Sequence, residues 1–247
     1  MEDITSNETQ TWVEYQNNST HSFMEQLPRV NEINRRLYDL THVKTFELPQ
    51  KHGDYFYFVH DAGTNTSDTI IYKMKKKNDY QFDEDNVLSS AEEFLDLSLL
   101  AEGTGESASS ESLFWSGNGS YIAFTTSIHG SDVGAIRVYD TKKKQETPDV
   151  IPDLKFTSAT WDNKEQGFFY TKISKNKEGN EETRIFYHKM GTPIAKDELV
   201  YQNLHEHDAS FSLQLSSDNK FLILTTTKGT EKATLKHFMD INDMSKF

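Results

Sequence analysis

The 247-residue sequence contains no cysteine, which excludes disulfide bonds, thiolate zinc sites and a cysteine nucleophile. Long apolar runs are also absent, because no stretch approaches the roughly 20 residues that a membrane-spanning helix needs. The first ten residues, MEDITSNETQ, have neither the basic nor the apolar segment of a secretory signal. These absences predict a cytoplasmic protein that does not enter a membrane.

Basic residues are outnumbered, with 26 Lys and Arg against 39 Asp and Glu and a formal net charge of −13 at pH 7. This balance argues against nucleic acid and anionic membranes as partners, because both are polyanions. Its main expected effect is solubility. Hydrophobic residues make up 35% of the chain and aromatic residues 12%, which favours a packed core over disorder.

Residues 5 to about 41 have the apolar spacing of amphipathic helices. Thr5 or Ser6 is a candidate N-cap, and Pro28 interrupts the apolar face before the pattern resumes in VNEINRRLYDL (30–40). We therefore predict a helical N-terminal arm over residues 1–48. Four of its apolar side chains would form an exposed patch unless they pack on another surface: Trp12, Phe23, Met24 and Leu27.

From about residue 49 the apolar period changes to two, as in strands. One pattern recurs at intervals near 50 residues: an apolar residue, a polar turn, then an apolar run that a second strand follows. The copies are FWSGNGSYIAF (114–124), TWDNKEQGFFYT (160–171), QLSSDNKFLILT (214–225) and the weaker PQKHGDYFYFV (49–59). The unbroken apolar runs predict central strands that are buried on both faces.

Several short strands per repeat of 40–50 residues are typical of a β-propeller. We therefore predict a mainly β fold, an incomplete β-propeller that follows the helical arm. Residues 49–247 would form about three and a half blades, approximately 49–113, 114–159, 160–213 and an incomplete 214–247. Propellers close with about four to eight blades, so open edges here predict either a longer protein or association, including self-association.

The chain resembles the N-terminal part of the prolyl oligopeptidase (prolyl endopeptidase) family of serine peptidases. The resemblance begins with SNETQTWVEYQN in the arm and DYFYFVHDAGTN after it. It is most specific in SIHGSDVGAIRVYDTKKKQETPDVIPDLKFTSATWDNKEQGFFY, and it continues through IFYHKMGT and LSSDNKFLIL. These blocks follow the order and approximate spacing of the family across nearly the whole sequence.

The resemblance implies a seven-bladed propeller and an arm that packs on an α/β-hydrolase domain. That domain would carry the Ser, Asp and His that cleave short peptides after proline. Its serine lies on a G-x-S-x-G turn, and the nearest string here, GESAS (105–109), lacks the final glycine. We therefore expect no catalytic residue in these 247 residues, no cofactor, no metal and no activity of the chain alone.

His129, Ser131 and Asp132 are the residue types of a catalytic triad, but neighbours on one tight turn diverge and cannot converge as a triad must. We interpret this stretch as a hairpin between two strands. The resemblance implies that Asp132 faces the catalytic domain, although Val133 replaces an aromatic residue there. It also implies that Phe156 lies near the substrate pocket; the alternative for Phe156 is a core aromatic.

Two further motifs favour loops. His205, Glu206 and His207 lack evident third and fourth metal ligands, and GTGESASSES (103–112) lacks the Gly-Lys-Ser/Thr of a phosphate-binding loop. The competing hypotheses are thus the N-terminal part of a prolyl oligopeptidase-like enzyme and a non-catalytic interaction module.

Overall fold

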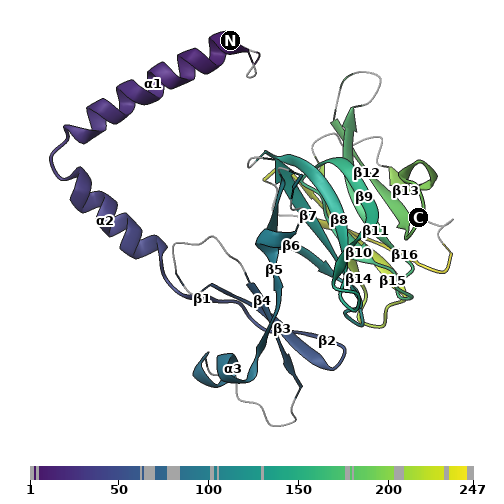
Figure 1. The fold of residues 1–247 in the computed structure, drawn as a ribbon. Helices are drawn as coiled ribbons and strands as arrows, with labels where there is room; N and C mark the ends of the chain where they lie inside the picture. Colours follow the sequence, from purple (N-terminus) through teal and green to yellow (C-terminus); the bar gives the residue numbers. More distant parts are fainter. Residues whose placement is uncertain are drawn as a thin grey trace. The chain divides into compact units, whose positions relative to one another are not determined.

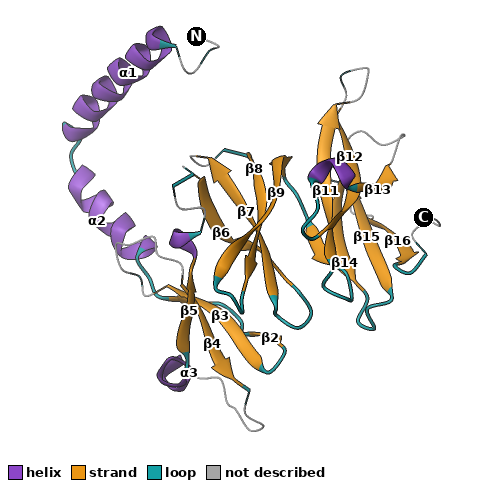
Figure 2. Ribbon diagram, turned by 45° about the vertical axis from the view of Figure 1, so that its right-hand side comes forward, coloured by secondary structure: helices purple, strands orange, loops and turns teal. Residues whose placement is uncertain are grey.

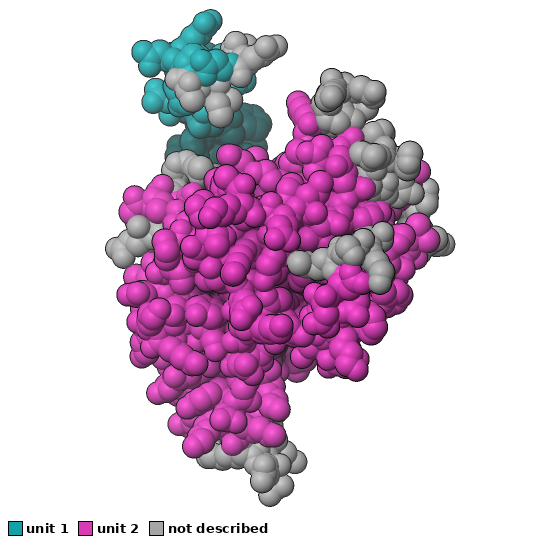
Figure 3. All heavy atoms as spheres, turned by 90° about the vertical axis from the view of Figure 1, so that its right-hand side faces the viewer, with its two compact units in different colours: residues 1–45, 61–66 teal, residues 46–60, 67–247 magenta. Residues whose placement is uncertain are grey.

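The computed structural model describes residues 3, 6–61, 63, 70–76, 84–100, 103–104, 106–128, 131–175, 179, 181–202, 209–230 and 234–243. The chain forms two compact units, coloured separately in Figure 3: residues 1–45 with 61–66, and residues 46–60 with 67–247. The domain limits expected from the sequence, 1–48 and 49–247, stay a prediction.

The first unit consists mainly of α1 (Asn7–Glu25) and α2 (Val30–Thr41), shown in Figure 1. Ser6 caps α1, because its Oγ accepts a hydrogen bond from the backbone N–H of Thr9 at 3.2 Å. Arg29 separates the helices with a left-handed φ of 74°. No helix in the described part of the chain is long and apolar enough to cross a membrane.

The second unit contains four antiparallel sheets, and Figure 2 shows the first and second of them as separate groups of strands. The first has the order β1-β3-β4-β5, with β2 also paired to β3; its strands are β1 (Thr45–Phe46), β2 (Gln50–His52), β3 (Tyr55–Asp61), β4 (Ile70–Lys75) and β5 (Glu92–Asp96). The second contains β6 (Glu106–Trp115), β7 (Tyr121–Ile128), β8 (Val133–Asp140) and β9 (Gln145–Lys155).

The third sheet contains β10 (Ala159–Trp161), β11 (Gly167–Lys175), β12 (Glu181–Lys189) and β13 (Glu198–Gln202), and the fourth β14 (Ala209–Leu215), β15 (Phe221–Lys228) and β16 (Thr234–Asp240). Short helices are α3 (Glu84–Ser90), η1 (Leu97–Leu99) and η2 (Ile194–Lys196). Within the second, third and fourth sheets, each strand pairs with the next along the chain. This confirms the mainly β fold with a helical N-terminal arm.

Apolar clusters join successive sheets. Ile122 and Phe124 of β7 belong to the cluster with the first sheet, whereas Ala123 between them packs with Trp161 and Phe168 of the third. A further cluster links the third and fourth sheets. The three β7 residues are fully buried, because a strand with a sheet on each side has no solvated face. The prediction drawn from the unbroken apolar runs is confirmed here.

The four sheets repeat one hydrogen bond. In each sheet it joins the two ends of a pair of consecutive strands. The residue directly after the second strand donates its backbone N–H to the carbonyl oxygen of the residue directly before the first strand. The pairs, donor first, are Lys76 with Asp54, Thr141 with Ser120, Met190 with Gln166, and Ile241 with Lys220, at 2.9–3.1 Å. The turn before the first strand of each pair (β3, β7, β11 and β15) contains a residue with positive φ: Gly53, Gly119, Glu165 and Asn219. The sequence repeat is therefore a repeat of backbone geometry.

The copies of the sequence repeat do not begin where the sheets begin. Each of the three stronger motif copies starts within the first strand of its sheet, at Phe114 in β6, Thr160 in β10 and Gln214 in β14. The reason is that the motif marks a turn and the buried strand after it. The first strand of each sheet lies mostly before the turn and has no comparable signature.

His52 connects the first and second sheets by stacking on Trp115, with ring centroids 4.7 Å apart and an interplanar angle of 13°. Within the described part of the chain, its buried Nε2 has no hydrogen-bond partner. Burial lowers the pKa of His52 from 6.5 to about 4. The ring is therefore neutral in the folded chain at pH values where it is protonated in the unfolded chain.

We expect acid to destabilise the chain through His52, because proton uptake by the unfolded state increases as the pH falls from about 6.5 toward 4. Solvent screening at this partly exposed ring reduces the expected loss to about 1–2 kcal/mol. Urea unfolding at pH 7 and pH 4.5 measures it. The control, His52→Phe, keeps an aromatic ring on Trp115 without the titration; an equal acid loss in both proteins would contradict the prediction.

Candidate functional site

A pocket of about 230 Å³ opens where β7 ends, β8 begins and β9 leaves the second sheet. It contains both of the site residues expected from the sequence, Asp132 and Phe156. The rest of its wall combines apolar groups such as Leu154 with several hydroxyl side chains: Thr125, Thr126, Ser127, Ser131 and Thr157. Such a mixture suits a ligand with both apolar and hydrogen-bonding groups, such as a peptide.

Phe156 is not a core aromatic, because 70% of its surface is exposed. Its φ of 48° lies in the left-handed region, which is unfavourable for a bulky side chain. Residues held in such conformations cost about 1–3 kcal/mol and cluster at binding and active sites. The Lys155 ammonium group lies 5.1 Å from the centre of the Phe156 ring and covers one of its faces.

The segment between the second and third sheets holds Phe156 in this conformation. Thr157 Oγ1 donates to the carbonyl oxygen of Thr171 at 2.7 Å, and the backbone N–H of Ser158 donates to Thr171 Oγ1 at 2.8 Å. Ser158 Oγ in turn accepts the N–H of Leu213 from the fourth sheet at 3.1 Å. Two residues after Phe156, Ser158 is thus held by hydrogen bonds to the third sheet through its backbone and to the fourth sheet through its side chain.

Asp132 is exposed at the start of the turn into β8. Beside it, Ser131 Oγ accepts the backbone N–H of Val133 at 3.1 Å, a local bond that stabilises turns. His129 lies outside the described residues, so the structure gives no geometry for a contact between His129 and Ser131. The hairpin interpretation fits β7 and β8, which pair from Tyr121 with Asp140 to Ser127 with Gly134.

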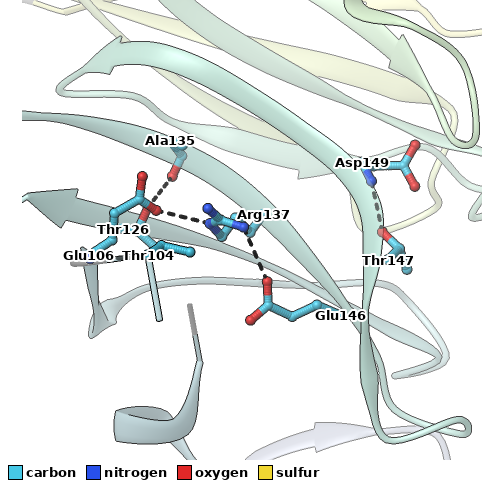
Figure 4. A network of polar contacts seen from close by, with 8 residues as sticks. All are labelled: Thr104, Glu106, Thr126, Ala135, Arg137, Glu146, Thr147 and Asp149. Atoms are coloured by element: carbon cyan, nitrogen blue, oxygen red, sulfur yellow. Dashed lines mark hydrogen bonds and ion pairs between the residues drawn. The ribbon is translucent and has the colours of Figure 1, made fainter. Parts of the chain in front are cut away.

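A charged network adjoins the pocket at Thr126 (Figure 4). Glu106 Oε2 accepts hydrogen bonds from Thr126 Oγ1 at 2.8 Å and from Arg137 Nε at 2.9 Å, while Arg137 Nη1 lies 3.5 Å from Glu146 Oε2. Burial alone would raise the pKa of Glu106. The hydrogen bonds from Thr126 and Arg137 and the Arg137 charge outweigh burial and lower that pKa.

The sequence did not single out this network or Thr171. Glu106 and Arg137 are 31 residues apart, and Thr157 and Thr171 are 14 apart. No local spacing connects such residues. The one local signal is TTS (125–127), a run of small hydroxyl side chains at the end of an apolar strand.

The residues considered as metal ligands, His205, Glu206 and His207, lie outside the described residues. Among the residues that the structure describes, no group of three or more His, Cys, Asp or Glu side chains is arranged to hold a metal ion. The groups that the pocket offers to a ligand are an aromatic ring, a carboxylate and several hydroxyl groups.

Comparisons with known proteins agree on one family. The family profile described as "Prolyl oligopeptidase, N-terminal beta-propeller domain" matches residues 1–246. A prolyl endopeptidase of Elizabethkingia meningoseptica is 24% identical over 100% of this chain and 34% of its own length. Prolyl oligopeptidase A of Amanita bisporigera is 25% identical over 96% of this chain and 33% of its own length.

Solved structures show the same fold. A structure from a study of two prolyl endopeptidases has a TM-score of 0.76 and 20% identity, covering 97% of this chain and 34% of that one. Prolyl oligopeptidase B of Galerina marginata, bound to a 25mer macrocyclization substrate, also has a TM-score of 0.76 and 20% identity, with 96% and 34% coverage. The chain thus spans about a third of the length of the curated relatives it matches, and it belongs to the prolyl oligopeptidase family as an N-terminal β-propeller domain.

Proposed function

We propose that this chain is the N-terminal part of a cytoplasmic serine-type endopeptidase that cleaves short peptides after proline. In this proposal an α/β-hydrolase domain outside these 247 residues supplies the catalytic Ser, Asp and His, and the propeller restricts access to short peptides. The observation that carries the proposal is the pocket shared by Asp132 and Phe156 in a domain of this family.

Phe156 is the proposed apolar contact for the substrate. Its exposed ring has no role in the core, and its backbone is held in a strained conformation. Asp132 contributes a negative charge at the same opening, directed at the hydrolase domain or at a cationic group of the peptide. The hydroxyl groups around them can hydrogen-bond to peptide N–H and carbonyl groups.

The first experiment tests inactivity. We expect the purified 247-residue chain to release no fluorophore from a proline-containing fluorogenic peptide, because it has no G-x-S-x-G nucleophile turn. A prolyl endopeptidase serves as the positive control. Turnover by the chain that a serine-directed phosphonate abolishes would overturn this part of the proposal.

The second experiment tests the pocket. We expect Phe156→Ala to weaken the binding of a fluorescent proline-containing peptide at least about fivefold, since a partly buried aromatic contact contributes about 1 kcal/mol or more. The matched control is Phe238→Ala on β16, where the phenyl ring is 62% exposed. Equal affinities of Phe156→Ala and the unsubstituted chain would remove the pocket from the proposal.

The alternative function is a non-catalytic interaction module. Exposed apolar side chains favour it, with Trp12 48% and Phe23 63% exposed on α1, and Leu235 57% exposed on β16. The coding DNA around the 247 codons distinguishes the two. An in-frame G-x-S-x-G downstream supports the peptidase, whereas a stop codon with stable expression supports the module. Self-association through open sheet edges belongs to this alternative, and a monomer in light scattering would count against it.

A further inference from the structure

His188 is a fully buried histidine whose two ring nitrogens both face carboxylates. Nδ1 lies 2.8 Å from Asp197 Oδ1, and Nε2 lies 3.2 Å from Asp149 Oδ1. Both carboxylates are themselves buried, with side-chain exposures of 3% and 4%. Asp149 comes from β9 of the second sheet, and His188 comes from β12 of the third, so the contact crosses between sheets.

Each carboxylate also accepts a hydrogen bond from a group that only donates here. The Tyr170 hydroxyl donates to Asp197 Oδ2 at 2.9 Å, and the Gly191 N–H donates to Asp149 Oδ1 at 2.5 Å. Burial, followed by the hydrogen bond to Asp197, raises the pKa of Tyr170 far above its usual value, so the hydroxyl keeps its proton. Both carboxylates are therefore placed as acceptors, the role of the ionised form.

A neutral imidazole has one N–H and one lone pair, so it can donate to only one of two acceptors. With the other carboxylate it would bring a lone pair against an ionised oxygen in a buried, apolar environment, which is strongly unfavourable. In the described part of the chain, the ring nitrogens lie against Asp149 and Asp197, and the Phe168 ring has its centroid 5.2 Å from that of the imidazole. An imidazolium donates to both carboxylates and avoids the conflict.

We propose that His188 is an imidazolium at neutral pH and that it forms a cationic joint between the second and third sheets. The joint fixes the position of β12 against β9, because only one placement brings both nitrogens to carboxylate oxygens. Apolar packing between the same sheets tolerates small shifts, whereas a buried charge left without its partner does not. The joint is a structural device and does not depend on the peptidase function.

The first test is the protonation state of the ring in the unsubstituted 247-residue chain at pH 7. Long-range ¹H–¹⁵N NMR correlations distinguish protonated from unprotonated ring nitrogens, and the His188 signals are those that disappear in His188→Gln. We expect both nitrogens of His188 to have the shifts of N–H groups. One unprotonated nitrogen would overturn the proposal. The protonation state is read from the unsubstituted chain, and His188→Gln serves only to assign the signals.

The second test is a double-mutant cycle on thermal unfolding with His188→Gln and Asp149→Asn. We expect each substitution alone to lower the unfolding midpoint, because it leaves the charge of the other residue buried without its partner. The double substitution removes both charges, so it should lower the midpoint by clearly less than the sum of the two single effects. The control cycle is Lys143→Gln with Asp140→Asn, an ion pair in which the lysine side chain is 69% exposed and little coupling is expected. Additive losses at His188 and Asp149 would contradict the joint.

Discussion

Gly134→Ala is expected to destabilise the chain by about 3 kcal/mol or more, one of the two largest effects that the structure predicts. A Cβ on Gly134 would lie 1.6 Å from the carbonyl oxygen of Thr126 and 2.7 Å from its carbonyl carbon. These are backbone atoms of the paired strand β7, so no side-chain rotation relieves the overlap. The two strands must move apart beside the pocket that Gly134 and Thr126 both line.

Gly117→Ala is the matched control, because a Cβ there has no neighbouring atom within 4 Å and its φ is not in the left-handed region. We expect it to change the free energy of unfolding by no more than about 0.5 kcal/mol. Urea unfolding of both variants measures the difference. A Gly134→Ala chain as stable as Gly117→Ala would show that β7 and β8 do not approach as closely as the structure has them.

Much of the fold could be predicted because its signals are local. The runs around Phe124 and Phe169 are apolar on consecutive residues, which only a strand covered on both faces tolerates, and both side chains are buried. The turns before them contain Gly, Asn and Asp, the residues that accept left-handed or tightly bonded backbone. The repeat of turn and buried strand was therefore visible before any contact was known.

The site could be predicted only in part. The resemblance pointed to Asp132 and Phe156, and the structure brings both to one pocket. The positive φ of Phe156 could not be predicted, because local preference disfavours it and contacts made by Thr157 and Ser158 impose it. The sequence alone left Phe156 open as a core aromatic, and its exposure decides that question.

Contacts between sheets were the part that the sequence could not predict. Trp161 Nε1 donates to the carbonyl oxygen of Phe114 at 2.8 Å across 47 residues, and His188 meets Asp149 across 39. Such partners depend on how the sheets stack, and neither residue type nor spacing along the chain indicates the pairing.

Arg137→Met is expected to lower the free energy of unfolding by about 2–4 kcal/mol, somewhat less than the cost of breaking a fully buried ion pair. The side chains of Arg137 and Glu106 are only 17% and 15% exposed, so the substitution leaves a poorly solvated carboxylate without its cation. Glu146, 26% exposed, loses the same partner. Methionine keeps the length of the side chain, which limits the loss of packing. Urea unfolding at pH 7 measures the effect.

The pH dependence separates charge from packing. Because the pKa of Glu106 is held below 4.5 in the folded chain, its stabilising effect is present above that pH and is lost as the pH falls through the lower, folded value. The difference between Arg137→Met and the unsubstituted chain should therefore shrink in acid. Lys143→Met is the control, since that exposed ion pair with Asp140 contributes less than about 1 kcal/mol. If Arg137→Met lowers the free energy of unfolding by the same amount at pH 7 and pH 3.5, the effect comes from lost packing and not from the ionised network beside Thr126.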